Sequence, residues 1–335
     1  MLVAQISKKG GPFEIVERPM PEPGPGQVRL KVDACGICHS DQIFKEGNWP
    51  GLKFPVVPGH EVAGRVDKIG AGVTRFKVGQ RAGVGWNGGY CGHCQPCFEG
   101  EFPYCTTGAT TAASFDGGYA EYMVAPETAV AAMPEGIDAT EAGPLMCAGI
   151  TTYNALRTSG AKSGDLVAVQ GIGGLGHLAV QFAAKSGYHT VAISRGKDKE
   201  AFAKELGAHE YIDDANGDAA QQLQKMGGAK VLLATAPNAK AISGLAGGLK
   251  YKGKLLIVAA PHDNVEVSPL LLLMGSRSVA GHYSGYAKDS EDTLEFSALT
   301  GVRPKVEVYP LAKVNEAYER MLSNKARFRV VLKMT

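Results

Sequence analysis

The chain has 335 residues, of which 44% are hydrophobic and 20% charged, and its formal net charge is +2. This length exceeds one ordinary hydrophobic core, so two domains are expected, and the composition is that of a folded globular protein. Because the charge is near neutral and no long basic run occurs, neither nucleic acid nor an anionic membrane is expected as a partner.

The sequence also lacks segments typical of membrane insertion or export. The longest strongly apolar runs, Leu255–Ala260 and Leu270–Met274, are far shorter than a membrane span. Residues Met1–Glu14 lack the apolar core of a signal peptide. Seven cysteines, an odd number, without an export signal favour thiolates and metal over disulfides. We therefore expect a cytoplasmic protein.

The chain before about residue 130 is expected to form mostly antiparallel β-structure. In Gln27–Ala34 apolar residues alternate with charged ones, which is the period of a half-buried strand. Similar segments, separated by Gly-rich turns, are Leu2–Ile15, Val62–Ile69, Arg81–Val84 and Tyr119–Val124.

Two loops in this part carry side chains that suit a metal. They read Cys38-His39-Ser40-Asp41 and Gly59-His60-Glu61-Val62-Ala63-Gly64. A thiolate and an imidazole are preferred by a borderline-soft metal such as zinc, and the acidic neighbours Asp41 and Glu61 are placed to orient them. A Cys–His pair alone fits a buried thiol and a core histidine better, so the metal interpretation depends on the motifs that follow.

Four cysteines form a compact cluster with the spacing C-x2-C-x2-C-x7-C: Cys91, Cys94, Cys97 and Cys105. Four thiolates in one loop can close a tetrahedron around zinc, which is typical of a structural site. The bacterial ferredoxin run for an iron–sulfur cluster has three residues before its last cysteine and a proline after it, so zinc is favoured. Cys35 is expected to be a small buried residue. If the fold brings Cys147 to Cys38 and His60, the set is Cys2His with an open fourth position.

Beyond Pro144, short apolar strands alternate with helical patterns, which predicts a parallel sheet covered on both faces. The expected strands are Asp165–Gln170, Thr190–Ser194, Val231–Ala234 and Lys254–Ala259, and the expected helices are Leu175–Ser186 and Lys197–Leu206. The pattern loosens near His282, and Arg327–Met334 is expected to be a strand that returns to the first domain. The expected domains are 1–147, with a lobe at 91–105, then 148–281, and 282–335 as the completion of the first.

A glycine-rich loop joins the first of these strands to the first helix. It reads Gly171-Ile172-Gly173-Gly174-Leu175-Gly176 and fits G-x-G-x-x-G. In this strand–loop–helix context the motif predicts a dinucleotide site, because glycines let the backbone approach a pyrophosphate and the helix N-terminus offers amide donors.

The tip of the second strand bears on the choice of cofactor. A domain selective for NAD usually has an Asp or Glu there, about 20 residues beyond the glycines. Here the tip carries Ser194 and Arg195, with Lys199 nearby, which suit a 2′-phosphate. Asp198 lies four residues past the expected point and is expected to start the next helix. We therefore predict a preference for NADP(H) over NAD(H); the alternative is a solvated Arg195 and use of both cofactors.

In this order, and together with Cys147-Ala148-Gly149-Ile150-Thr151, these motifs resemble the zinc-dependent alcohol dehydrogenases of the medium-chain dehydrogenase/reductase superfamily over essentially the whole chain. The resemblance implies an α/β plus β fold: a GroES-like catalytic domain with an inserted Rossmann domain built on a doubly wound parallel sheet. It implies two zinc ions per chain. Cys38, His60 and Cys147 would hold the catalytic zinc, with Glu61 beside it or as a transient ligand. The four-cysteine lobe would hold the structural zinc, and Thr151 would contact the cofactor.

The resemblance also implies reversible hydride transfer between an alcohol, or the corresponding aldehyde or ketone, and a nicotinamide cofactor, in a homodimer or homotetramer. Ser40 is the expected carrier of the hydroxyl proton. Relatives often have a relay histidine five residues after the first zinc-binding cysteine, where this chain has Ile43. Proton exit through water or His39 stays open, as does a contact of His39 with the cofactor pyrophosphate. Trp49 and Trp86 are expected to line the alcohol pocket, with ordinary aromatic packing as the alternative.

Two other functions fit the same fold. A polyol or sugar dehydrogenase would need a wetter pocket than one flanked by two tryptophans. A zinc-free quinone reductase, or a nucleotide-binding lens-type structural protein, would lack the ligand set of Cys38, His60 and Cys147 that this sequence keeps.

Overall fold

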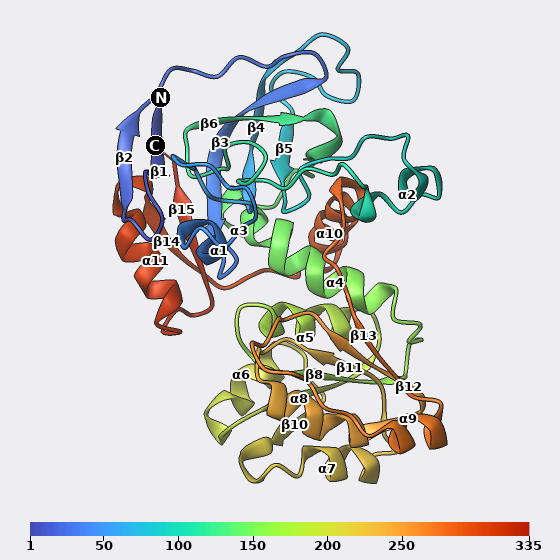
Figure 1. Cartoon of the computed structure of the whole chain (residues 1–335). Helices are drawn as coiled ribbons and strands as arrows, with labels where there is room; N and C mark the ends of the chain where they lie inside the picture. Colours follow the sequence, from blue (N-terminus) through green and yellow to red (C-terminus); the bar gives the residue numbers. More distant parts are fainter. Residues whose placement is uncertain (335) are drawn as a thin grey trace. The chain divides into compact units, whose positions relative to one another are not determined.

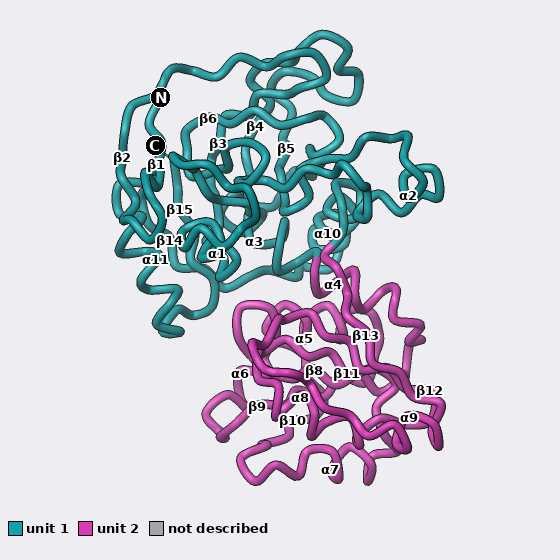
Figure 2. The backbone as a smooth tube through the Cα atoms, viewed as in Figure 1, with its two compact units in different colours: residues 1–150, 285–335 teal, residues 151–284 magenta. Residues whose placement is uncertain are grey.

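A computed structural model describes residues 1–334 (Figure 1). The chain forms two compact units (Figure 2). Unit 1 combines residues 1–150 with the chain from residue 285 onward, and unit 2 is the continuous segment Thr151–Ser284. The domain limits expected from the sequence, with an inserted domain at 148–281, remain our proposal. Among the described residues, no helix has the length and hydropathy of a membrane span.

Unit 1 is built mainly of β-structure. A sheet of seven strands has the order β14-β15-β3-β4-β5-β7, with β6 also pairing with β3, and β1 and β2 form a separate antiparallel pair. The strands are β1 (Leu2–Ile6), β2 (Phe13–Glu17), β3 (Gln27–Ile37), β4 (Val62–Ile69), β5 (Arg81–Val84), β6 (Tyr122–Pro126), β7 (Val130–Ala132), β14 (Val306–Pro310) and β15 (Arg329–Lys333).

The helices of unit 1 are mostly short. They are α1 (Asp41–Lys45), α2 (Gln95–Phe98), α3 (Ala139–Pro144), α10 (Ala287–Thr300) and α11 (Val314–Leu322), with single turns η1 (Phe102–Tyr104), η2 (Glu127–Ala129), the π-helical η3 (Leu145–Gly149) and η7 (Leu311–Lys313).

Apolar and polar residues alternate along β3, and this places Val28, Leu30 and Val32 in the hydrophobic core, as the sequence predicted. Strand β15, from the end of the chain, pairs antiparallel with β3, with Leu332 opposite Cys35. The C-terminal segment therefore completes the sheet that carries the first cysteine loop. The single strand expected at Leu2–Ile15 is wrong, because a turn at Gly10, with φ +70°, separates β1 from β2.

Unit 2 contains a parallel sheet of six strands in the order β10-β9-β8-β11-β12-β13. This is the doubly wound order of dinucleotide-binding domains, so the predicted fold class is confirmed. The strands are β8 (Leu166–Gln170), β9 (His189–Ser194), β10 (Glu210–Asp213), β11 (Ala229–Ala234), β12 (Leu249–Ile257) and β13 (Ser278–Gly281).

Helix α4 (Ile150–Arg157) precedes β8, and its first residue belongs to unit 1. The helices between the strands are α5 (Gly176–Lys185), α6 (Glu200–Glu205), α7 (Ala219–Lys225), α8 (Ala239–Leu245) and α9 (Pro269–Gly275), with single turns η4 (Lys197–Lys199), η5 (Asp214–Asn216) and η6 (Ala246–Gly248). All five residues of β8 are buried, as expected for a strand covered on both faces. The glycine loop follows β8 where the strand order reverses towards β11, which is the usual place for a ligand in such sheets.

Candidate active site

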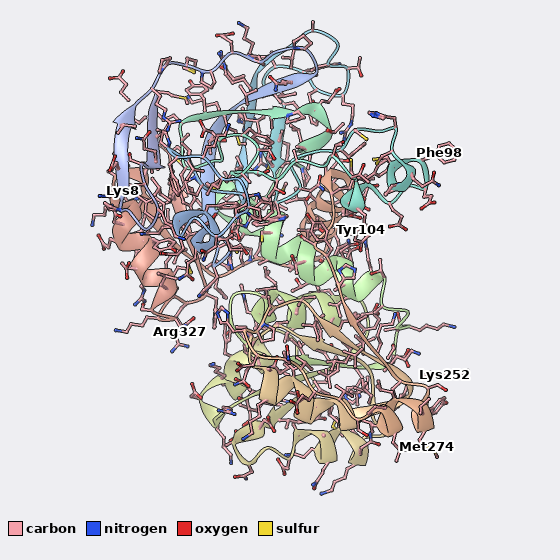
Figure 3. All side chains as sticks on the ribbon, viewed as in Figure 1. Lys8, Phe98, Tyr104, Lys252, Met274 and Arg327 are labelled. Atoms are coloured by element: carbon pink, nitrogen blue, oxygen red, sulfur yellow. The ribbon has the colours of Figure 1, made fainter. Side chains whose placement is uncertain are left out.

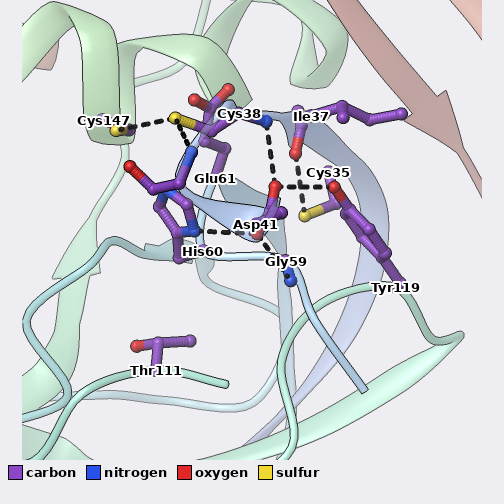
Figure 4. A network of polar contacts seen from close by, with 12 residues as sticks. Cys35, Ile37, Cys38, Asp41, Gly59, His60, Glu61, Thr111, Tyr119 and Cys147 are labelled. Carbon is purple, nitrogen blue, oxygen red and sulfur yellow. Dashed lines mark hydrogen bonds and ion pairs between the residues drawn. The ribbon is translucent and has the colours of Figure 1, made fainter. Parts of the chain in front are cut away.

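Unit 1 gathers three side chains that the sequence marked as metal ligands, together with Glu61 (Figure 4). One ligand atom from each of Cys38, His60, Glu61 and Cys147 lies within 4.8 Å of the others. Cys38 follows β3, His60 and Glu61 precede β4, and Cys147 lies in η3. The Sγ atoms of Cys38 and Cys147 are 4.0 Å apart.

The chemistry of this cluster fits zinc. Its donors are two sulfurs, an imidazole and a carboxylate, which is a set that zinc accepts. Two polar atoms in it, His60 Nε2 and Glu61 Oε2, are buried with no hydrogen-bond partner among the described residues. Leaving such atoms unpaired is costly, and a cation between them would remove that cost.

The pKa shifts of the Cys38 and Cys147 thiols also favour a bound cation. The contact with Cys147 lowers the pKa of Cys38 well below its ordinary value, although burial opposes this, and His60 and Arg329 lower it further. The same contact, with burial, raises the pKa of Cys147 well above its ordinary value. Two adjacent thiolates repel each other, so only a neighbouring dication would let both ionise at neutral pH.

Asp41 orients the imidazole of His60. The Asp41 carboxylate is buried, and its Oδ1 lies 3.1 Å from His60 Nδ1. With Nδ1–H donating to Asp41, Nε2 is the nitrogen that faces the cluster. Asp41 Oδ2 accepts the backbone N–H of Cys38 at 2.9 Å, so one carboxylate contacts both ligand loops.

Glu61 pairs with a residue that the sequence reasoning missed. Its Oε1 accepts a hydrogen bond from Arg329 in β15, and both side chains are buried. Burial raises the pKa of Glu61 to about 7, while Arg329 lowers it. Arg329 stands 268 residues further along the chain, and no local motif marks it.

Three aromatic rings lie beside the cluster. The ring of Trp86 meets His60 edge to face with centroids 4.9 Å apart, and Trp49 lies 5.8 Å from Trp86. Phe44 contacts both tryptophans and was not predicted, although it lies close to the cysteine loop in sequence. These rings give the cluster an apolar wall.

The residues considered from the sequence for proton transfer follow Cys38 in the chain. The N–H of Ser40 donates to Cys38 Sγ at 3.5 Å, and Ser40 is half-buried. His39 is exposed, and Ile43, in α1, occupies the position of the relay histidine in relatives.

The four cysteines of the lobe also come together. The ligand sulfurs of Cys91, Cys94, Cys97 and Cys105 lie within 4.8 Å of one another. A hydrogen bond from the backbone of His93 lowers the pKa of Cys91 to about 5. Burial, together with the neighbouring thiols, raises the pKa of Cys97 to about 12. Four thiols this close cannot all ionise without a cation, and four sulfurs in one lobe are a set that zinc accepts, so the lobe fits zinc as well.

In unit 2 the glycine loop leaves open space beside the backbone of Gly173. A Cβ atom on Gly176 would lie 1.7 Å from the carbonyl oxygen of Gly171, whereas a Cβ on Gly173 would meet nothing within 4 Å. His177 Nδ1 lies 2.9 Å from the Gly173 carbonyl oxygen, and Thr235 Oγ1 donates to that of Gly171 at 3.0 Å. The loop, which includes Gly174 and Leu175, is thus held in place and fits a pyrophosphate.

The tip of β9 carries Ser194, followed by an exposed Arg195 and the half-buried Lys199 in η4. The structure adds an acid that sequence reasoning missed. Asp213, opposite Ser194 on β10, accepts the N–H of Gly196 at 2.7 Å. Thr151, in α4, donates its hydroxyl to Ser284 Oγ at 3.0 Å.

Comparisons with known proteins agree with this geometry. The alcohol dehydrogenase GroES-like domain family matches residues 24–135, and the zinc-binding dehydrogenase family matches residues 174–298. The chain is 43% identical to alcohol dehydrogenase notN of Aspergillus sp. (strain MF297-2), covering 99% of this chain and 97% of that one. It is 37% identical to an alcohol dehydrogenase of Geobacillus stearothermophilus, covering all of both chains.

Among solved structures, a cinnamyl alcohol dehydrogenase from Sorghum bicolor has 32% identity and a TM-score of 0.88, covering 99% of this chain and 97% of that one. The chain therefore belongs to the zinc-dependent alcohol dehydrogenases of the medium-chain superfamily, which are oxidoreductases acting on alcohols.

Proposed function

We propose that this chain is a zinc-dependent alcohol dehydrogenase or aldehyde reductase that transfers a hydride reversibly between a primary or secondary alcohol and a nicotinamide cofactor. The observation that carries the proposal is the Cys38–His60–Cys147 cluster, in which the buried His60 Nε2 lacks a hydrogen-bond partner among the described residues. Three protein ligands leave a fourth position for a substrate, as in catalytic zinc sites.

Cys38, His60 and Cys147 would hold the catalytic zinc, with Glu61 beside it or as a transient ligand, and the four-cysteine lobe would hold a structural zinc. When bound, the catalytic zinc supplies a Lewis acid that polarises the oxygen of the alcohol or carbonyl group. We expect two zinc ions per chain from metal analysis of the purified protein. A protein without zinc would contradict the proposal.

The chain's own residues prepare the site. Asp41 keeps the proton of His60 on Nδ1, and the ring of Trp86, which packs against Phe44, covers one side of His60. Ser40 Oγ, two residues after Cys38, is the proposed carrier of the hydroxyl proton. From there the proton would leave through water or through His39, which is exposed.

A polyol or sugar dehydrogenase is the second candidate, and the aromatic wall disfavours it. A polyol needs polar partners for several hydroxyl groups, whereas the ring beside His60 is that of Trp86, which packs against Phe44 and Trp49. A panel that pairs simple alcohols and aldehydes with sorbitol, assayed by nicotinamide absorbance, tests this choice. Faster turnover of sorbitol than of every simple alcohol would favour the second candidate.

We also propose a preference for NADP(H), supported by Ser194, Arg195 and Lys199 at the tip of β9. A structural relative from Helicobacter pylori, with 28% identity, was solved with NADP(H). Two acids lie near this tip, Asp198 in η4 and Asp213 in β10. Asp213 Oδ1 already accepts two backbone N–H groups, from Gly196 at 2.7 Å and Ala215 at 3.0 Å. That oxygen is therefore engaged by backbone donors, which makes it less available to a ribose hydroxyl than the usual acid of an NAD-selective domain.

The ratio of kcat/KM for NADPH and NADH tests this preference. Wild type should favour NADPH, and Ser194→Asp should reverse the order by repelling the 2′-phosphate. Asp213→Asn is the matched control, because it removes the charge and keeps the acceptor oxygen. A wild type that prefers NADH, and loses that preference in Asp213→Asn, would show that Asp213 reads the ribose instead.

We further propose a homodimer or homotetramer in the cytoplasm. On α9, Leu270, Leu273 and Met274 are 66%, 76% and 80% exposed, and β13 is an edge strand of its sheet (Figure 3 labels Met274). An exposed apolar helix face and an edge strand that follows it in the chain suit a second copy of the chain. Light scattering on purified protein tests the assembly, and a monomer at micromolar concentration would contradict it. Seven free cysteines suit a reducing compartment.

A further inference from the structure

The carboxylate of Asp41 is fully buried and receives four hydrogen-bond donors (Figure 4). Its Oδ1 lies 3.1 Å from His60 Nδ1 and accepts the N–H of Gly59 at 3.3 Å. Its Oδ2 accepts the N–H of Cys38 at 2.9 Å and the hydroxyl of Tyr119 at 2.7 Å. Four donors on two oxygens match the acceptor-only, ionised form of the side chain.

Three of these donors belong to the two loops that carry Cys38 and His60, and the fourth comes from a separate segment. Tyr119 precedes β6, and its hydroxyl makes the shortest of the four contacts. Without this hydroxyl, Oδ2 would keep only the N–H of Cys38 as a protein donor, and the carboxylate could rotate away from His60.

Burial, backbone hydrogen bonds and close packing hold Tyr119 in place. The side chain is 0% exposed, and its backbone N–H donates to Pro58 at 3.0 Å while its carbonyl accepts the N–H of Ala4 at 2.7 Å. The ring packs so closely on Gly59 that a Cβ there would lie 2.5 Å from Tyr119 Cδ1. Burial raises the pKa of Tyr119 well above its ordinary value, so the hydroxyl stays a donor at every working pH.

We propose that Tyr119 is a positioning residue of the metal site: its hydroxyl locks Asp41, and Asp41 in turn aims His60 Nε2 at the ion. This inference rests on the proposed metal site at Cys38, His60 and Cys147. Groups that orient metal ligands in this way typically change metal affinity by about 10–100-fold when they are removed. Because Tyr119 acts through Asp41, we expect an effect at the lower end, about 10-fold.

The chain offers a matched control for removing one buried phenolic oxygen. Tyr318 is 1% exposed and its ring packs against Phe13, as does that of Tyr119, with centroids 5.1 Å and 5.9 Å away. The Tyr318 hydroxyl, however, has no hydrogen-bond partner among the described residues. Tyr318→Phe therefore removes the same atom from the same core without removing a hydrogen bond to Asp41.

The test measures metal binding directly in the full-length protein. The catalytic site is loaded with Co²⁺, whose visible absorbance reports the ligand geometry, and its dissociation constant is measured by competition with a chelator. The zinc of the four-cysteine lobe serves as an internal reference. We expect Tyr119→Phe to bind Co²⁺ about 10-fold more weakly, with a shifted spectrum, and Tyr318→Phe to match wild type.

A second arm shows whether Tyr119 acts through Asp41. In an Asp41→Asn background, the further change Tyr119→Phe should have little additional effect on the dissociation constant. Wild-type affinity and spectrum in Tyr119→Phe would overturn the inference, even if the variant melts at a lower temperature, since the role would then be structural only. A wild type that binds no metal at this site would instead overturn the proposed function, and the inference with it.

Discussion

Two glycines of the nucleotide loop should separate protein stability from cofactor binding. A Cβ on Gly176 would lie 1.7 Å from the Gly171 carbonyl oxygen and 2.9 Å from Thr235 Oγ1, so the loop or the helix must move. Forcing extra volume into a packed site typically costs about 1–3 kcal/mol. At about 1.36 kcal/mol per factor of ten, Gly176→Ala should lower the folding equilibrium constant of unit 2 by about 5–150-fold.

Gly173→Ala should behave in the opposite way. A Cβ on Gly173 meets nothing within 4 Å, and Gly173 is not among the residues with positive φ. Without cofactor, the change should be neutral or stabilise the protein by up to about 1 kcal/mol, because alanine lowers the conformational entropy of the unfolded chain. The second glycine of this motif is where the backbone approaches the pyrophosphate. Losing one charge-assisted hydrogen bond there, about 1.5–3 kcal/mol, should weaken cofactor binding by about 10–150-fold.

Thermal melts without cofactor and calorimetric titration with NADP⁺ check both variants. Gly176→Ala should melt well below wild type, and Gly173→Ala should melt like wild type yet bind NADP⁺ weakly. The reasoning would be refuted by a Gly173→Ala protein with wild-type affinity, or by a Gly176→Ala protein that melts at the wild-type temperature.

Three further changes test other parts of the molecule. Cys38→Ser should abolish turnover in a folded protein, whereas Cys97→Ser should lower the melting temperature, because a closed zinc site contributes folding energy; a Cys97→Ser protein with wild-type melting and activity would contradict this. Ser40→Ala should lower kcat by about 10²–10⁴-fold, and full activity would exclude Ser40 as the proton carrier. Glu307 accepts from Arg320 at 2.8 and 3.0 Å, and this contact lowers the pKa of Glu307 below its ordinary 4.5. The ion pair therefore stabilises the protein fully above pH 4.5, and this stabilisation is lost as the pH falls through the lowered pKa of Glu307. Glu307→Gln should melt below wild type at pH 7, and the two melting temperatures should converge in acid. A difference in melting temperature that does not depend on pH would argue against the ion pair.

Features that depend on short stretches of sequence were predictable. The lobe cysteines lie within Cys91–Cys105, so their spacing alone indicates a closed site. The glycine loop and its flanking strand and helix are similarly local, and the alternation of strands and helices predicted the parallel sheet. The loops around Cys38 and His60 pointed to a metal because residue type alone limits what such a pair can bind.

Contacts between distant segments were decided only by the tertiary structure. Cys38 and Cys147 are 109 residues apart, and their meeting was expected from family resemblance rather than from any local pattern. The pairing of Arg329 with Glu61 and of Tyr119 with Asp41 depends on which strands are neighbours and in what register. Periodicity in a sequence shows which face of a strand is buried, but not which strand lies beside it. For the same reason, the sequence of β9 and its tip does not indicate Asp213, which contacts Gly196 from the neighbouring strand β10.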